Sequence, residues 1–120
     1  MSEEYVQNPF PRTVPETRIV GKTIHWYPET ESTNTHALES HCSGEVFIAE
    51  QQTAGRGRHG RKWHSAPGLG LWFSVALDAS LPGLGFGGAL AVRNALIQAV
   101  PVRLRWPNDL YCGSRKVGGI

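Results

Sequence analysis

Short apolar clusters, separated by glycine, proline and polar runs, divide the chain, and their pattern predicts alternating strands and helices. Clusters rich in β-branched and aromatic residues indicate the strands. They lie at Thr23–Tyr27, Glu45–Glu50, Gly70–Leu77 and Val102–Trp106, and a closing hairpin is predicted from residues 110–112 and 116–120 around Gly113 and Ser114. Because a hairpin accompanies the alternation, the pattern predicts an α+β fold with a mixed β-sheet.

Two segments have the spacing of helices. Glu31–Ser40 predicts a short helix with Ser32, Thr33 or Asn34 as its N-cap. Ala89–Val100 predicts a second helix, because its apolar residues form one stripe. The glycine-rich run at 81–88, directly before it, predicts a turn.

The two ends of the chain set the expected domain boundaries. Residues 1–18 are expected to form a flexible arm, since they are acidic and contain Pro9, Pro11 and Pro15. The arm lacks the apolar region of a signal peptide, and no apolar run approaches the roughly 18 residues of a membrane span. Residues 19–120 form the expected domain, which stops at Ile120 within a predicted strand and is therefore expected to be incomplete.

Charge is unevenly distributed between the two parts of the chain. Residues 1–50 contain eight acidic and three basic side chains, whereas residues 51–120 contain nine basic and two acidic ones. Such a basic region favours a phosphate-bearing ligand or nucleic acid as partner. The two cysteines, Cys42 and Cys112, have no metal-ligand or C-x-x-C spacing, which indicates reduced thiols in a cytoplasmic protein.

The glycine-rich segment Gln51–Gly68 has the G-x-G-x-x-G spacing of dinucleotide-binding proteins. That fold requires a helix directly after the glycines, and Pro67 and Gly68 follow too soon for one. A P-loop is excluded as well, because Arg61 and Lys62 stand where Lys and Ser or Thr are needed. Both nucleotide-binding motifs are therefore rejected.

The remaining interpretation is a mobile loop that binds an anion. Its cations would contact phosphate or carboxylate, and Trp63 offers a flat face for a base. The alternative is an exposed loop with no ligand, which is disfavoured because the cations repel one another without an anionic partner. These cations are Arg56, Arg58, Arg61 and Lys62.

Five motifs in order resemble the biotin protein ligase family. The resemblance covers residues 19–120. The motifs are ESTN at 31–34, AEQQTAGRGRHGRKW at 49–63, LWFSV at 71–75, RWPND at 105–109 and KVGGI at 116–120. The resemblance implies the N-terminal part of that family's catalytic domain, with helices packed on one face of a mixed sheet. Octanoyl and lipoyl transferases share the fold but have a different loop, so they are the second candidate.

The resemblance implies a two-step reaction with ATP, and Mg²⁺ bound to ATP. Biotin's carboxylate attacks the α-phosphate to give biotinyl-5'-AMP, and a lysine of a biotin carboxyl carrier domain then takes the biotinyl group. The charged transition states call for fixed cations. No metal-ligating side chains are assigned, and a homodimer is one expected assembly.

The family's site residues transfer by matching position. Arg58 and Lys116 become the catalytic candidates, with Lys116 between the carboxylate and the α-phosphate. The implied biotin-binding residues are Ser32, Thr33, Asn34, Gln52, Arg56, Gly57, Arg58 and Lys116, and the nucleotide-binding residues are Arg58, Arg61, Trp63, Asn108 and Asp109.

Each motif has a simpler structural explanation. Residues 32–34 cap a helix, Pro107 and Asn108 form a turn, Gly118 marks a bulge, and Lys116 protects a strand edge. A third functional alternative is a non-catalytic fragment whose basic loop binds a partner or nucleic acid. The first 18 residues are too short for the DNA-binding domain of bifunctional ligase-repressors, so DNA binding by that route is not expected.

Overall fold

The computed structural model describes residues 7–14, 16–78 and 82–120. The chain divides into two compact units, residues 1–78 and 79–120, and each is described by itself. Of the predicted arm, residues 1–6 and 15 lie outside the described residues. Its described part is hydrogen-bonded to the start of the first strand, where Ile24 N donates to the Arg12 carbonyl at 2.7 Å.

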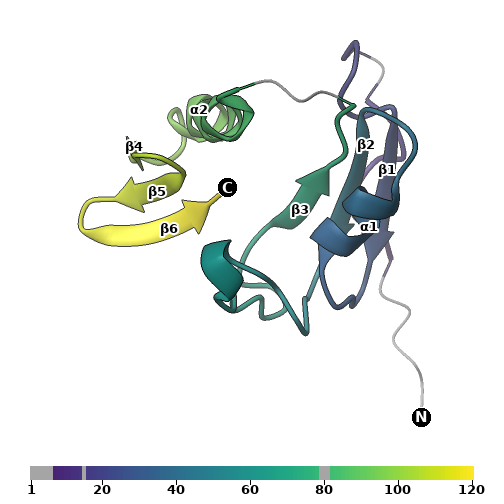
Figure 1. Ribbon diagram of the computed structural model, residues 1–120, viewed down its shortest axis with the longest axis horizontal. Coiled ribbons are helices and arrows are strands. Elements are labelled where there is room, and N and C mark those ends of the chain that lie inside the picture. Colours follow the sequence, from purple (N-terminus) through teal and green to yellow (C-terminus); the bar gives the residue numbers. More distant parts are fainter. Residues whose placement is uncertain (1–6, 15, 79–81) are drawn as a thin grey trace. The chain divides into compact units, whose positions relative to one another are not determined.

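The first unit contains a three-stranded mixed sheet with one helix on it (Figure 1). Its strands are β1 (Thr23–Tyr27), β2 (Glu45–Ala49) and β3 (Trp72–Val75), in the order β1-β2-β3. β1 runs parallel to β2, and β3 runs antiparallel to it. The helix α1 (Thr33–Glu39) connects β1 to β2 and packs against β2 and β3. The predicted mixed sheet is therefore confirmed.

β2 is the centre of this unit because it is paired on both sides. The residues Val46 to Ala49 are at most 8% exposed, as expected for a central strand made of apolar residues. Gly44 directly precedes this strand with φ +94°, and a Cβ there would lie 1.9 Å from the Ile19 carbonyl oxygen. Only glycine fits that position, which fixes where the chain enters β2.

Ring side chains stack on the face of the sheet that α1 covers. His25 stacks on Phe47 at 4.8 Å between ring centroids, and Tyr27 stacks on His36 of α1 at 4.3 Å. His25 Nε2 also lies 2.5 Å from Glu45 Oε2, a contact that lowers the pKa of that carboxyl. Burial raises the pKa of the Tyr27 phenol. These contacts tie α1 to the first two strands.

The second unit contains one helix and an antiparallel sheet (Figure 1). Helix α2 (Leu84–Leu96) precedes β4 (Val102–Arg105), β5 (Asp109–Cys112) and β6 (Arg115–Gly119), which pair in the order β4-β5-β6. α2 packs against β4 and β5. The two helices and two sheets confirm the α+β class.

The predicted bounds of the second helix were wrong. α2 begins at Leu84 within the run assigned to a turn, and it ends at Leu96, before Ala99 and Val100. Three glycines lie in its first two turns although each costs about 1 kcal/mol relative to alanine. Packing overrides that cost, because Ala89 in the middle of the helix is fully buried.

The β5–β6 hairpin contains a bulge directly after Lys116. Lys116 pairs with Tyr111 and Gly118 pairs with Leu110, so Val117 is the extra residue on β6. Lys116 therefore shares a face with Asp109, two residues from Tyr111 along β5. The predicted turn at Gly113 is confirmed, with φ +60°. The Trp106–Pro107 peptide bond before β5 is cis.

Candidate ligand-binding site

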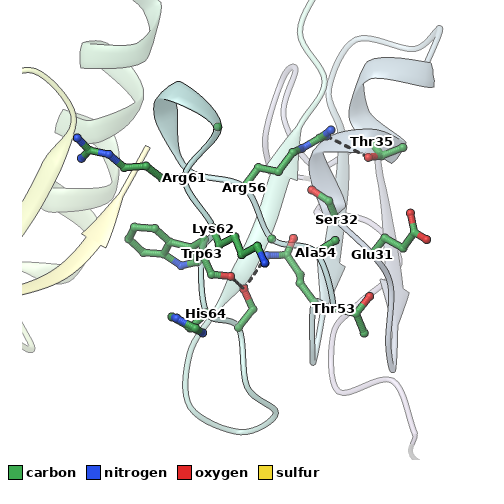
Figure 2. A pocket seen from close by; sticks show the side chains of 14 residues that line it. Glu31, Ser32, Thr35, Thr53, Ala54, Arg56, Arg61, Lys62, Trp63 and His64 are labelled. Atoms are coloured by element: carbon green, nitrogen blue, oxygen red, sulfur yellow. Dashed lines mark hydrogen bonds between the residues drawn. The ribbon is translucent and has the colours of Figure 1, made fainter.

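A pocket of about 550 Å³ lies within the first unit (Figure 2). Residues from three short segments line it: Glu31, Ser32 and Thr35 around the start of α1, residues 52–56 after β2, and residues 60–65 on the returning part of the glycine-rich loop. The strand–helix connection and the loop therefore meet at one cavity.

The glycine-rich loop is an irregular hairpin that folds back on itself. Gln52 pairs with Ser65, and Arg56 pairs with Lys62. Trp63 N donates to the Gly55 carbonyl at 2.8 Å. A single 3₁₀ turn, η1 (Arg58–Gly60), forms the tip. No α-helix follows the glycines, in agreement with the rejection of a dinucleotide-binding motif, and the loop's mobility stays a prediction.

Gly55 is required by a close approach inside this hairpin. A Cβ at Gly55 would lie 2.6 Å from the Trp63 carbonyl oxygen, 2.8 Å from Ser65 Oγ and 2.9 Å from Gln52 Nε2. All three distances are below normal contact for a carbon atom. The loop can bring its two limbs together here only because this position lacks a side chain.

One side of the pocket is supported by a hydrogen-bonded group of polar residues, here named the polar wall: Thr33, Gln52, Ser65 and Ser74. Gln52 Oε1 accepts from Thr33 N at 2.8 Å and from Thr33 Oγ1 at 3.2 Å. Gln52 Nε2 donates to Ser65 Oγ at 2.9 Å. Thr33 Oγ1 also lies 2.8 Å from Ser74 Oγ on β3. Thr33 and Ser65 are 3% and 5% exposed, so these hydrogen bonds are largely shielded from water.

Ser32 occupies the N-cap position of α1, but its hydroxyl makes no capping hydrogen bond. Ser32 is 4% exposed and lines the pocket. Substituting serine at an N-cap is usually costly because the hydroxyl satisfies a helix N–H. At Ser32 that hydrogen bond is not made.

Three cations line the pocket and are here named the cation arc: Arg56, Arg61 and Lys62. All three are exposed. Arg56 Nη2 donates to Thr35 Oγ1 of α1 at 3.0 Å, whereas Arg61 points to the opposite side (Figure 2). Glu31 is the acidic residue of the lining, so positive charge dominates the cavity.

The structure brings together part of the expected site. Residues predicted to bind the ligand that line the pocket are Ser32, Gln52, Arg56, Arg61 and Trp63. Thr33 lies behind Gln52 and contacts it rather than the cavity. The remaining expected residues of this unit, Asn34, Gly57 and Arg58, are outside the lining.

The other expected residues belong to the second unit. Lys116 Nζ lies 3.0 Å from Asp109 Oδ1, which forms an ion pair across the β5–β6 hairpin. Asn108 Nδ2 donates to the Ile120 carbonyl at 3.0 Å, and Ile120 N donates to the Asn108 carbonyl at 2.9 Å. The amide of Asn108 thus has a structural role in closing this hairpin.

Sequence reasoning missed Ser65, Ser74 and Thr35. Each uses its hydroxyl to hold another site residue, and serine and threonine are too common in loops and strands for such a role to be visible from composition. One signal was available for Ser65, since it follows Trp63 at the end of the glycine–arginine loop. The G-x-G-x-x-G spacing includes Gly55 but does not predict the close approach there.

The described ranges contain neither a metal-binding cluster nor a membrane-spanning helix. Within residues 7–14, 16–78 and 82–120, no three His, Cys, Asp or Glu side chains are grouped so as to hold a metal ion. No helix in the part of the chain that the structure describes is long and apolar enough to cross a membrane.

An α+β fold with a cavity between a polar wall and a cation arc defines a ligand-binding domain suited to a molecule with an anionic end. Comparison with known proteins specifies this class. Residues 26–120 match the model of the biotin/lipoate A/B protein ligase family. The chain belongs to this family.

Individual relatives agree with that assignment. The bifunctional ligase/repressor BirA of Escherichia coli is 37% identical over 114 residues, covering 86% of this chain and 35% of the relative. The biotin–[acetyl-CoA-carboxylase] ligase of Mycobacterium tuberculosis is 35% identical over 108 residues, covering 77% of this chain and 41% of that protein. The chain therefore spans well under half the length of these relatives.

Solved structures of biotin protein ligases share the fold. The Aquifex aeolicus enzyme in complex with biotin and ATP gives a TM-score of 0.72 at 40% identity, covering 82% of this chain and 45% of that one. The Leishmania major enzyme in complex with biotinyl-5-AMP gives 0.69 at 28% identity, covering 80% and 49%.

Proposed function

We propose that this chain carries the biotin-activating site of an ATP-dependent biotin protein ligase. The observation that supports the proposal best is the single cavity lined by both Gln52 of the polar wall and the three cations of the arc. Relatives that bind biotin with ATP, or biotinyl-5-AMP, have the same fold. Biotin has a neutral polar ring at one end and a carboxylate at the other, which matches the two chemistries of the cavity.

The proposed reaction has two steps. A biotin carboxylate oxygen attacks the α-phosphorus of ATP, the bond to the β-phosphate oxygen breaks, and pyrophosphate leaves. A lysine amine of a carrier domain then attacks the acyl carbon, loses a proton, and releases AMP. Negative charge builds up at phosphorus in the first step and on the acyl oxygen in the second, so cations fixed beside these atoms lower both barriers.

The polar half of the cavity is assigned to biotin. Ser32 supplies a buried hydroxyl without a capping bond, and Gln52 supplies an amide oriented by Thr33. Asn34 belongs to this group through the family resemblance, and so do Arg56 and Gly57 of the loop. Preformed hydrogen bonds favour binding because little ordering remains to be done when the ligand arrives.

The cationic half is assigned to the carboxylate and the nucleotide. Arg58 and Lys116 are the proposed catalytic residues, and Arg61 and Trp63 the proposed nucleotide contacts of the loop. Lys116 is held by Asp109 at 3.0 Å, so its ammonium must exchange a carboxylate for the ligand's anionic oxygens. Asn108 and Asp109, in the second unit, are assigned to the nucleotide through the family resemblance. Mg²⁺ would arrive with ATP and neutralise its phosphates, with the Asp109 carboxylate as the acidic side chain assigned to that side.

Calorimetry with biotin and ATP tests the proposal directly. We expect saturable biotin binding, weakened roughly tenfold or more by Arg58→Ala because a charge-assisted contact is lost. Arg103→Ala, an exposed arginine of β4, is the matched control and should bind as the parent does. Pyrophosphate release then tests catalysis, and Lys116→Ala should slow it roughly a hundredfold, the usual effect of losing one charge-stabilising group.

Two results would contradict the proposal. A folded chain that gives no heat with biotin in the presence of ATP would leave only a fragment with the family's motifs. Nucleic-acid binding that falls steeply with salt, without any response to biotin, would favour the non-catalytic alternative.

A further inference from the structure

A chain of hydrogen bonds crosses the base of the glycine-rich loop and ends at a residue that the family resemblance does not assign. The Trp63 carbonyl can only accept, so Ser65 donates its single hydroxyl proton to it at 3.3 Å. Ser65 Oγ must then accept from Gln52 Nε2, which lies 2.9 Å away. The direction of both hydrogen bonds is thereby fixed.

The oxygen of the Gln52 side-chain amide is also fixed by a hydrogen bond. Thr33 N is a donor and lies 2.8 Å from the amide, so the atom facing it is the oxygen Oε1. Turning the amide over would place two donors against each other at Thr33. The amide of Gln52 is therefore held at both ends, by α1 through Thr33 and by the returning limb of the loop through Ser65.

The missing side chain at Gly55 leaves room for the hydrogen-bonded junction formed by Trp63, Ser65 and Gln52. The three atoms that a Cβ at Gly55 would strike are the Trp63 carbonyl oxygen, Ser65 Oγ and Gln52 Nε2, which are the three atoms linked by these hydrogen bonds. Ser65 is 5% exposed, so water competes little for its hydroxyl. The loop is thus built around the junction.

One of the two hydrogens on Gln52 Nε2 is donated to Ser65. Because the amide group is planar, this hydrogen bond also fixes the direction of the second N–H. Gln52 lines the pocket, and among the described residues the second hydrogen has no acceptor. The second N–H of Gln52 is therefore held at a fixed angle to the first, on a residue that lines the pocket.

We propose that Ser65 is a positioning residue for ligand binding: it orients the Gln52 amide so that its second N–H points to an acceptor on biotin. The inference rests on the proposed function for the identity of the ligand. Ser65, whose hydroxyl proton goes to the Trp63 carbonyl, is assigned to act on the ligand through Gln52.

Binding constants for biotin and ATP, measured separately by calorimetry on Ser65→Ala, test the proposal. We expect biotin to bind roughly five- to tenfold more weakly, the usual effect of losing one hydrogen bond's orientation, with ATP affinity unchanged. Ser65→Thr keeps the hydroxyl and should restore biotin affinity. Ser40→Ala removes another hydroxyl of the same unit, one that donates to Glu45 away from the pocket, and should leave both affinities unchanged.

Side-chain amide exchange, measured by NMR without any ligand, separates this inference from the proposed function. The Gln52 Nε2 protons should exchange slowly in the parent and roughly tenfold faster in Ser65→Ala, because the acceptor is gone. Equal exchange rates, or an equal loss of biotin and ATP affinity, would overturn the positioning role. If the parent binds no biotin while the exchange rates differ as expected, the proposed function fails and the hydrogen-bonded junction stands.

Discussion

The polar wall that supports one side of the cavity and the cation arc that lines it are built in opposite ways. Thr33 and Ser65 of the wall are 3% and 5% exposed and hydrogen-bonded to Gln52, whereas the arc consists of exposed side chains. Buried, satisfied hydrogen bonds make a rigid surface, because breaking any of them leaves an unpaired polar group. Exposed cations keep their freedom and act through a field that salt weakens.

The two halves of the cavity are expected to recognise a ligand in different ways. A rigid wall discriminates among neutral polar groups by geometry, since the donors and acceptors are in place beforehand. A cation arc attracts anions from a distance and adjusts to them afterwards. Changes in the wall should therefore alter stability together with biotin binding, and changes in the arc should alter nucleotide binding with little effect on stability.

The largest effect should come from Gly55→Ala, which breaks the wall at its junction. The added methyl would lie 2.6 Å from the Trp63 carbonyl oxygen, so the loop must shift, at a cost of about 1–3 kcal/mol in the free energy of unfolding. Biotin binding should be lost as the Gln52 amide moves. Urea denaturation and calorimetry measure the two effects.

Gly87→Ala in α2 is the matched control for that substitution. No atom lies within 4 Å of its added Cβ, and the site is helical, so the change should stabilise the chain by about 0.5–1 kcal/mol. If both alanines had the same effect, the close approach at Gly55 would be irrelevant to the site.

Thr33→Val should have the next largest effect. Valine keeps the shape but removes the hydroxyl that contacts Gln52 and Ser74, and the unpaired polar groups should cost about 1–2 kcal/mol of stability. Biotin affinity should fall while ATP affinity is kept. Thr35→Val removes a hydroxyl that binds Arg56 on the partly exposed side of α1, and it should destabilise less. A larger effect at Thr35 would reverse the proposed contrast between wall and arc.

Arg61→Ala tests the arc. Because Arg61 is exposed, we expect ATP binding about fivefold weaker and a change in unfolding free energy below about 0.5 kcal/mol. The difference in ATP affinity should shrink between roughly 0.02 and 0.5 M salt, since screening weakens exposed charges. Arg18→Ala, also exposed but outside the pocket lining, is the control. A loss that does not depend on salt would mean that Arg61 is part of a rigid contact.

The smallest effect is expected from breaking the ion pair between His25 of β1 and Glu45 of β2. The hydrogen bond from His25 lowers the pKa of Glu45, so the carboxylate is favoured in the folded chain. The stabilisation it contributes is present above the carboxyl's unfolded pKa and is lost as pH falls through its folded pKa, below about pH 5. Glu45→Gln should thus be less stable than the parent at pH 7, by below about 1 kcal/mol, and equally stable near pH 3.

Urea midpoints followed by circular dichroism at several pH values measure this convergence. Glu39→Gln, at the exposed end of α1, is the control and should remain parallel to the parent across the range. A constant difference between parent and Glu45→Gln would show that the carboxylate's charge does not matter.

The sequence predicted local structure well where side-chain period and turn residues agree. Strands β1, β2 and β4 and the Gly113 turn were found because each is short, apolar and bounded by breakers. The start of α2 was missed because glycine propensity argues against a helix, and only the burial of Ala89 outweighs it. The bulge offered at Gly118 lies one residue earlier, at Val117, because its position depends on the pairing with β5.

For the site, the sequence alone determined the family, the chemistry of the loop and the presence of a basic, glycine-rich segment after a buried strand. Tertiary structure decided which of these groups act together. Thr33 and Ser74 are 41 positions apart yet 2.8 Å from each other, and Ser65 reaches Gln52 only because Gly55 lets two limbs meet. The reason is physical: a residue's identity fixes what its side chain can donate or accept, but only strand register and chain approach fix what it faces.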